Sequence, residues 1–177
     1  MKLHLGCGKK YIGNEWIHID IQKFNHIDYQ IDIRNLDIFK NESIDEIYIC
    51  HVLEHFPRNE LENILSEWYR VLKVGGMLRI AVPDFESVCN LYKSGMDIEK
   101  FYGLVSGGQK NEYDFHYHIF DEKSLSSMMY KIGFSKVVRY DWKDFLPSDY
   151  DDYSKAYIPH LDFQTGTLVS LNLIAIK

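Results

Sequence analysis

Short apolar runs alternate with stretches of helical periodicity over the first two thirds of the chain, and this alternation restricts the possible folds more than any other feature. The runs typical of strands cover residues 2–5, 16–20, 28–32, 46–50 and 77–82. Strands that alternate with helices form a largely parallel sheet with helices on its faces. A chain of 177 residues has room for one core of ordinary size. The sequence therefore predicts a single α/β domain of the doubly wound type over residues 1–177.

Two helices follow from the spacing of apolar residues. Over residues 58–73, large apolar side chains recur at intervals of three and four residues, and Gly75 and Gly76 follow as a stop signal. A second helix is expected between Asp121, as its N-cap, and a terminating Gly133. Each helix carries one apolar stripe, which has to pack on the sheet.

The last predicted strand, residues 168–176, has no helical crossover before it. A strand is expected at 136–141, and the residues between the two, 143–166, are rich in Asp, Tyr and Pro. Strands that are joined without a crossover helix pair antiparallel. We therefore expect the last strand to be antiparallel and to lie at an edge of the sheet, where it offers a pairing surface to a second copy. The chain is expected to be a monomer or a homodimer.

Charge and composition exclude several classes of partner. The formal net charge is −6 and the longest basic run is Lys9-Lys10, which argues against nucleic acid and anionic membranes and favours a small-molecule substrate. No run of about 18 apolar residues is present, as a membrane span would require. The amino-terminal residues lack the pattern of a signal peptide, and the three cysteines show no CxxC spacing. We therefore expect a cytoplasmic protein.

A glycine-containing loop follows the first predicted strand, and an acidic residue ends each of the next two. Residues 6–8 read Gly-Cys-Gly, Asp20 ends the second strand, and Asp32 ends the third and precedes Ile33. Glycines let backbone N–H groups approach a ligand, and a carboxylate at a neighbouring strand end accepts bonds from ribose hydroxyls. Asp32 and Ile33 are placed to contact an adenine. The sequence thus predicts a nucleoside site, although each feature taken singly reads equally as a turn or a helix cap.

These motifs resemble those of the class I S-adenosylmethionine-dependent methyltransferases, in particular their small, compact members. Residues 45–56 are similar to the fourth strand and its loop, 70–78 to the following helix-to-strand turn, and 120–134 to the late helix and the sixth strand. The resemblance implies a seven-stranded, Rossmann-like sheet with an antiparallel last strand, and S-adenosylmethionine as cofactor. It implies that the cofactor is bound by Leu5, Gly6, Cys7, Gly8, Asp20, Ile21, Asp32, Ile33, Cys50 and His51.

The chain departs from the family pattern at several places. His4 stands where the family has an acid, and Lys10 where it has a third glycine, which keeps open a non-catalytic nucleoside-binding module as an alternative. Residues 6–16 are too few for a normal crossover helix. We therefore expect the acceptor to be covered by two segments on the substrate side, residues 84–117 and 143–166. The second of these reads either as a wall over the acceptor or as a solvated loop.

Histidines supply the candidate catalytic groups. Methyl transfer is an in-line displacement that depends mainly on positioning, and it needs a base when the acceptor is a hydroxyl. His55, His116 and His118 are the candidate bases, with Glu54 as an orienting residue. The favoured function is therefore O-methylation of a small acceptor, with a sugar or another cell-envelope precursor as the suggested class.

Residues 51–55 also fit two metal-binding patterns. They match the HxxEH motif of inverzincin peptidases, but that site needs a regular helix, which Pro57 opposes. Together with His116 or His118, they are similar to the divalent-metal site of the small-RNA 3′-terminal 2′-O-methyltransferases. The acidic chain argues against RNA, and His51 replaces an acid of that pattern. A divalent metal is therefore not favoured, and no metal ligand is assigned.

Overall fold

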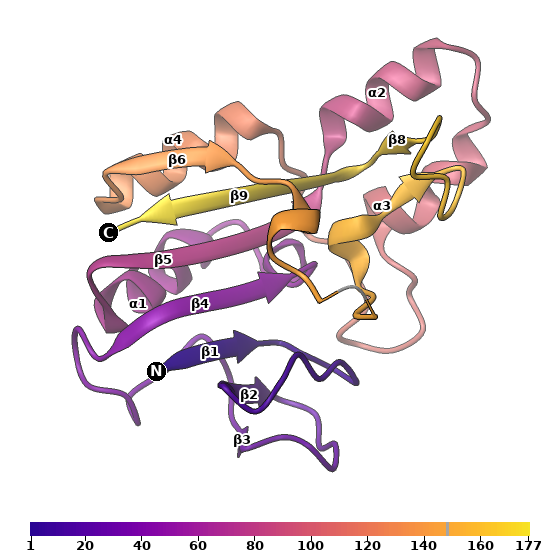
Figure 1. The fold of residues 1–177 in the computed structure, drawn as a ribbon. Coiled ribbons are helices and arrows are strands. Elements are labelled where there is room, and N and C mark those ends of the chain that lie inside the picture. The colour runs from indigo at the N-terminus through magenta and orange to yellow at the C-terminus, as the bar shows by residue number, and fades with distance from the viewer. Residues whose placement is uncertain (148) are drawn as a thin grey trace.

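The computed structural model describes residues 1–147 and 149–177 and is built on one seven-stranded sheet (Figure 1). Its strands are β1 (Lys2–Leu5), β2 (Trp16–Asp20), β3 (Tyr29–Gln30), β4 (Ile44–Cys50), β5 (Leu72–Pro83), β6 (Lys136–Arg139) and β9 (Ser170–Ile176). Their order across the sheet is β3-β2-β1-β4-β5-β9-β6. Strands β1 to β5 pair in parallel, and β9 pairs antiparallel with both β5 and β6. The predicted α/β class and the antiparallel last strand are confirmed.

The position of the last strand was predicted wrongly. β9 lies between β5 and β6, so the edges of the sheet are β3 and β6. The reason is visible in its side chains: Leu171, Leu173 and Ala175 are fully buried on one face, and Ser170 and Asn172 are buried on the other. A strand that is buried on both faces belongs in the interior of a sheet. β9 therefore offers no free edge to a second copy.

Helices α1 (Leu61–Val71) and α4 (Glu122–Ile132) cover one face of the sheet and pack against each other (Figure 1). α1 begins three residues later than predicted, after a turn that follows Pro57. α4 has the predicted cap: Asp121 accepts a bond from the Ser124 backbone N–H and Ser124 reciprocates. The main hydrophobic core lies between these helices and the sheet.

The opposite face of the sheet is covered by loops. The residues between β1 and β2 and between β2 and β3, all of which the structure describes, form turns and bends and no helix. Residues 142–155 take the place of crossover helices here: Leu146 and Tyr150 are buried with Ile12, Trp16 and Tyr48 in a second apolar cluster. Within the segment 143–166, residue 148 lies outside the described residues. The segment is therefore not merely a solvated loop, because it closes a sheet face that would otherwise be bare.

The remaining elements lie mostly beyond the carboxyl ends of the parallel strands (Figure 1). They are η1 (Leu53–His55), α2 (Phe85–Lys93), η2 (Ile98–Phe101), α3 (Tyr102–Ser106), η3 (Trp142–Asp144), η4 (Tyr153–Lys155) and the hairpin β7 (Tyr157–Ile158) with β8 (Thr167–Leu168). Among the described residues, no helix has both the length and the apolar character that a membrane span requires.

The loop-covered face buries His4, and this burial makes the fold sensitive to acid. His4 lies in register between His18 and Tyr48, and burial, together with the nearby imidazoles of His18 and His26, lowers the pKa of His4 to about 3. The unfolded chain binds a proton at this residue below its ordinary pKa of 6.5, whereas the folded chain does not. Stability should therefore fall as the pH drops from 6.5 towards 3, by up to about 1.4 kcal/mol per pH unit from this group.

A His4→Leu variant isolates this contribution because leucine fills similar volume and does not titrate. Urea unfolding at about pH 7.5 and about pH 5, on either side of the ordinary histidine pKa, should show a smaller loss of stability in the variant than in the wild type. Equal losses in the two proteins would show that His4 does not contribute to the acid sensitivity.

Candidate functional site

A cavity of about 370 Å³ opens at the carboxyl edge of the parallel strands. Loops that follow β1, β2, β3 and β4 form most of its wall, and the segment after α3 completes it. The lining residues are Gly6, Gly8, Asp20, Ile21, Gln22, Asp32, Ile33, Arg34, His51, Val52, His55, Phe56, Pro57, Glu112, Tyr113 and Tyr117. Open α/β sheets bind their ligands at this edge, and the volume falls in the range of small-molecule sites.

The glycine loop brings bare backbone to the cavity. Gly6 and Gly8 have φ angles of 60° and 54°, in the left-handed region that glycine adopts without strain. A Cβ on Gly6 would lie 2.7 Å from the Val52 Cγ2 atom, so the loop packs closely on the segment after β4. A Cβ on Gly8 would meet nothing within 4 Å. The residues present therefore leave room for a ligand beside Gly8.

Asp20 holds this loop in place. Its buried carboxylate accepts hydrogen bonds from the backbone N–H of Gly8 at 2.7 Å and from that of Gln22 at 2.8 Å, one on each oxygen. A carboxylate offers about four acceptor sites, so both oxygens keep a lone pair for ligand hydroxyls. Asp20 thus links the loop after β1 to the end of β2 at the wall of the cavity.

Asp32 forms an ion pair with Arg34. It lies in the turn after β3, because that strand ends at Gln30, two residues earlier than predicted. The Arg34 side chain donates to it at 2.6 Å and 2.8 Å, and the Arg34 backbone N–H donates at 2.9 Å. Burial raises the pKa of Asp32, but these bonds outweigh it and hold the pKa below its ordinary value. The next residue, Ile33, is buried, and its carbonyl accepts a bond from the Trp68 indole at 3.0 Å.

The other end of the cavity is lined by histidines. His51 follows β4 with a φ of 53°, and His55 ends the short helix η1. Burial and the nearby rings of His116 and His55 lower the pKa of His51 to about 3, and burial also lowers the pKa of His55. Both imidazoles are therefore neutral near pH 7. Residues 51–55 form no regular helix, so the geometry of an inverzincin peptidase is absent from this described segment.

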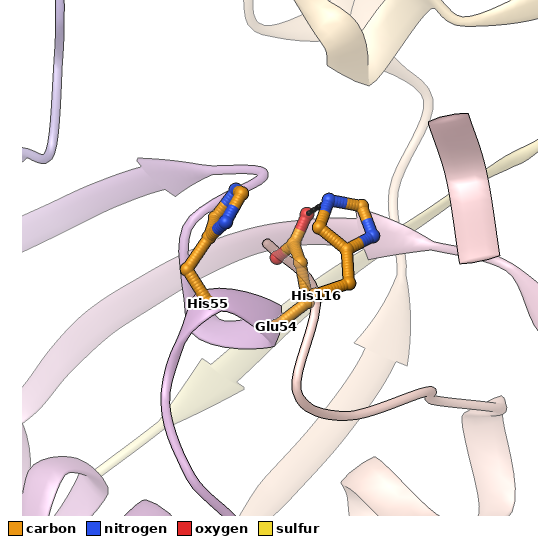
Figure 2. A group of neighbouring side chains, drawn as sticks. All are labelled: Glu54, His55 and His116. Atoms are coloured by element: carbon orange, nitrogen blue, oxygen red, sulfur yellow. Dashed lines mark ion pairs between the residues drawn. The ribbon is translucent and has the colours of Figure 1, made fainter. Parts of the chain in front are cut away.

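Glu54 is fully buried, and its carboxylate lies between the side chains of His55 and His116 (Figure 2). Within the described part of the chain, neither carboxylate oxygen has a hydrogen-bond partner. His51 Nδ1 lies 3.5 Å and His116 Nε2 lies 3.9 Å from Oε1 of Glu54. Burial raises the pKa of Glu54 to about 8. One ligand-type atom from each of Glu54, His55 and His116 lies within 4.8 Å of the other two.

The predicted site residues divide into two groups. Those that line the cavity are Gly6, Gly8, Asp20, Ile21, Asp32, Ile33, His51 and His55. Leu5, Cys7 and Cys50 are not among its lining residues. Leu5 belongs to the main core, Cys7 lies 4.0 Å from His26, and Cys50 packs against the second apolar cluster. Their predicted role in cofactor binding stays a prediction.

The structure brings two of the three candidate bases together and places the third elsewhere. His55 and His116 come together around Glu54, with ring centroids 4.7 Å apart. The ring of His118 instead lies edge-on against Phe120, at 4.6 Å, and does not line the cavity. The segment 115–118 is placed by bonds from the backbone N–H groups of Tyr117 and His118 to the carbonyl of Glu54.

Several lining residues carry no motif that the sequence alone reveals. Gln22 and Arg34 each lie two residues after a predicted acid, but no pattern marks them. Glu112, Tyr113 and Tyr117 lie in the segment 84–117 that was expected to cover the acceptor, and its aromatic residues were the available signal. The other expected cover, 143–166, reaches the site through Tyr153, whose ring lies 5.4 Å from that of His51.

Comparisons with known proteins agree with this architecture. Residues 10–80 match the model of a family described as "Methyltransferase domain". No curated protein matches the sequence. The matched region contains the ends of β2 and β3 and the histidine segment after β4.

Solved structures share the fold over nearly the whole chain. A SAM-dependent methyltransferase from Methanosarcina mazei is 20% identical, with a TM-score of 0.60, and 99% of this chain and 91% of that chain are covered. A possible histamine N-methyltransferase from Thermotoga maritima is 17% identical, with a TM-score of 0.63 and coverage of 99% and 81%. The Burkholderia thailandensis 1,6-didemethyltoxoflavin-N1-methyltransferase, solved with S-adenosylhomocysteine, is 14% identical, with a TM-score of 0.60 and coverage of 99% and 70%.

At these identities the structural likeness concerns the fold, and the family model supplies the sequence evidence. The strand order and the matched methyltransferase domain lead to the same assignment. The chain therefore has the fold of solved SAM-dependent methyltransferases, and its residues 10–80 are similar in sequence to a methyltransferase domain.

Proposed function

We propose that the chain transfers a methyl group from S-adenosylmethionine to a hydroxyl of a small-molecule acceptor. The observation that carries the proposal is a cavity with carboxylates at one end and a neutral imidazole at the other. Asp20 and Asp32 mark the nucleoside end, and His55 marks the end where the reacting atoms would meet.

The residues at the nucleoside end fit the cofactor. Gly8 leaves open space beside its backbone, Asp20 has lone pairs to spare for ribose hydroxyls, and Ile33 presents an apolar wall for a base. Arg34 forms an ion pair with Asp32 and neutralises its charge. The Asp32 carboxylate would therefore accept a hydrogen bond from an adenine amino group while it stays paired with Arg34. When bound, S-adenosylmethionine supplies a methyl carbon that is activated by a positively charged sulfur.

The imidazole of His55 supports a hydroxyl acceptor. Its Nδ1 lies 3.0 Å from the Phe115 carbonyl oxygen, and a carbonyl only accepts, so Nδ1 carries the proton. Nε2 of the neutral ring then has a lone pair that can take a proton from an acceptor. Displacement at an activated carbon depends on positioning, and a base contributes when the nucleophile must lose a proton. Tyr113 and Tyr117 add aromatic rings with polar tips to the cavity wall, which suits a sugar or a similar polyhydroxylated precursor.

A small molecule is preferred over nucleic acid because the sequence contains no long basic run. The net charge is −6, and the carboxylates of Asp20, Asp32 and Glu112 line the cavity. These charges would repel a phosphate backbone.

Calorimetry with S-adenosylmethionine and S-adenosylhomocysteine tests the cofactor assignment. Both should bind the full chain, and Asp20→Asn should weaken binding by about 10- to 100-fold, because a hydrogen bond to a charged group contributes about 1.5–3 kcal/mol. The amide oxygen of this variant can accept from the Gly8 N–H, and only the Gln22 N–H loses its acceptor, so the loop should persist. Asp37→Asn, at an exposed acid that does not line the cavity, should bind like the wild type.

The outcomes separate the two functional classes. If the folded wild-type chain binds neither compound, the proposed function fails. If it binds both but releases no S-adenosylhomocysteine with any of a panel of sugars and other hydroxyl compounds, the alternative of a non-catalytic nucleoside-binding module is supported instead.

A further inference from the structure

When Glu54 is ionised, its carboxylate and the nitrogens that face it are all hydrogen-bond acceptors, with no donor between them. Glu54 is fully buried, and neither of its oxygens has a partner among the described residues. The atoms that approach Oε1 are His51 Nδ1 and His116 Nε2. The chemistry of the site depends on whether those two nitrogens carry protons. The hydrogen bond made by the other nitrogen of each ring determines where the proton lies.

His116 is fixed by its contact with the Leu104 carbonyl. Its Nδ1 lies 3.0 Å from that oxygen, which only accepts, so the proton of the neutral ring is on Nδ1. Nε2 therefore turns a lone pair towards Glu54. His55 is fixed in the same way by the Phe115 carbonyl, so its Nε2 also carries a lone pair.

His51 is fixed through a chain of hydrogen bonds. The Asn172 side-chain amide donates to the Ser154 carbonyl at 2.9 Å, which leaves Asn172 Oδ1 as an acceptor. The Ser170 hydroxyl donates to that oxygen at 2.9 Å, so Ser170 Oγ accepts from His51 Nε2 at 3.0 Å. The proton of His51 is thus on Nε2, and Nδ1 presents a lone pair to Glu54.

When Glu54 is ionised, its buried carboxylate faces lone pairs at a cost in free energy, and either a proton or a metal cation between these atoms removes that cost. The geometry fits a shared cation. Ligands that are about 2.1 Å from a tetrahedral ion lie about 3.4 Å apart. Oε1 of Glu54 lies 3.9 Å from His116 Nε2, a contact that is too long for a good hydrogen bond and close to this spacing.

We propose that Glu54, His55 and His116 bind a divalent transition-metal cation at the histidine end of the cavity (Figure 2). Their ligand atoms lie within 4.8 Å of one another, so a closure of at most about 1.4 Å between any two of them reaches a bonding arrangement. The bonds to the Leu104 and Phe115 carbonyls are the kind of second contact that orients metal-binding imidazoles.

The donor set selects the type of metal. Two imidazoles and one carboxylate suit zinc, cobalt, manganese or iron, whereas magnesium and calcium prefer oxygen ligands. Three protein ligands leave at least one position open, as in catalytic sites. His55 lines the cavity, so that position is accessible to an acceptor. This part rests on the proposed function: a cation here would occupy the Nε2 lone pair of His55 and would replace that nitrogen as the group that activates the acceptor hydroxyl, by lowering the pKa of the hydroxyl and orienting it.

A metal site here reverses the preference drawn from the sequence, which assigned no metal ligand. The sequence shows residues 51–55 and 116, but it does not show that the carbonyls of Leu104 and Phe115 fix the ring protons. Nor does it show that Glu54 is buried without a donor among the described residues.

Metal titration of the full, untagged chain tests the proposal. After treatment with EDTA and dialysis, calorimetry with Zn²⁺ alone and the visible spectrum of added Co²⁺ should each report one equivalent bound per chain, and excess Mg²⁺ should not displace it. Glu54→Gln should weaken the affinity by at least about 10-fold, since even indirect partners of metal ligands contribute that much. His160→Ala, which removes an exposed histidine outside the cluster, should bind as the wild type does.

Glu54→Gln also controls for folding. Its amide donates hydrogen bonds and can satisfy His51 Nδ1 or His116 Nε2, so the metal-free variant should melt at or above the temperature of the metal-free wild type. Zn²⁺ should raise the melting temperature of the wild type but not that of the variant.

The proposal is overturned if neither ion binds, if Glu54→Gln binds unchanged, or if His160→Ala loses binding to the same extent. Calorimetry with S-adenosylhomocysteine on the metal-free chain keeps the two conclusions separate. Binding of the nucleoside without metal binding would overturn this inference alone, and metal binding without nucleoside binding would overturn the proposed function alone.

Discussion

Replacing Trp68 with alanine should lower the free energy of unfolding by about 3–5 kcal/mol. Trp68 is among the largest fully buried side chains and lies in α1, where that helix packs on the sheet. The substitution removes the buried ring and leaves a cavity that the surrounding helices and strands fill only in part. It also leaves the Ile33 carbonyl without its indole donor.

Trp68→Phe separates these two effects. Phenylalanine keeps most of the apolar volume and loses the bond to Ile33, so we expect a much smaller loss, of about 1–3 kcal/mol. Because Ile33 and Asp32 line the cavity, both variants should also bind S-adenosylhomocysteine more weakly. Urea unfolding measures the stabilities. A loss of less than about 1 kcal/mol for Trp68→Ala would contradict the packing described here.

The second large effect is expected at His55. With any hydroxyl acceptor that supports turnover, His55→Ala should lower kcat by about 10²- to 10⁴-fold, the usual contribution of a positioned acid or base. A loss of kcat is expected whether His55 accepts the proton itself or binds a metal that activates the hydroxyl. Release of S-adenosylhomocysteine at saturating acceptor measures kcat.

Two controls make this result specific. His160→Ala should retain kcat, because that histidine is exposed and outside the cavity lining. His55→Ala should still bind S-adenosylhomocysteine, because the nucleoside end of the cavity is unchanged. A kcat within about threefold of the wild type would remove His55 from the reaction.

Local sequence signals predicted most of the fold. The spacing of apolar residues marks α1, and the Asp121 cap and Gly133 mark the ends of α4. The position of β9 was missed because register and order in a sheet depend on partners far away in the sequence. Its burial on both faces was visible only once β5 and β6 were placed beside it.

The same distinction between local and distant signals applies to the site. Gly8, Asp20 and Asp32 are recognisable because a strand and its following loop fix them locally. For the cluster around Glu54, the sequence groups residues 51–55 with His116 or His118 but does not choose between them, because the backbone of Glu54 itself positions the segment that carries both. The covering role of residues 142–155 was missed because nothing local shows that one sheet face lacks helices.

A crystal structure of the chain with S-adenosylhomocysteine tests the central claim most directly. We predict the adenine beside Ile33, the ribose on the Asp20 carboxylate, and the sulfur towards His51 and His55, inside the cavity of about 370 Å³. Nucleoside density outside this cavity, or a cavity that stays free of ligand when the compound is present at saturating concentration, would contradict this assignment.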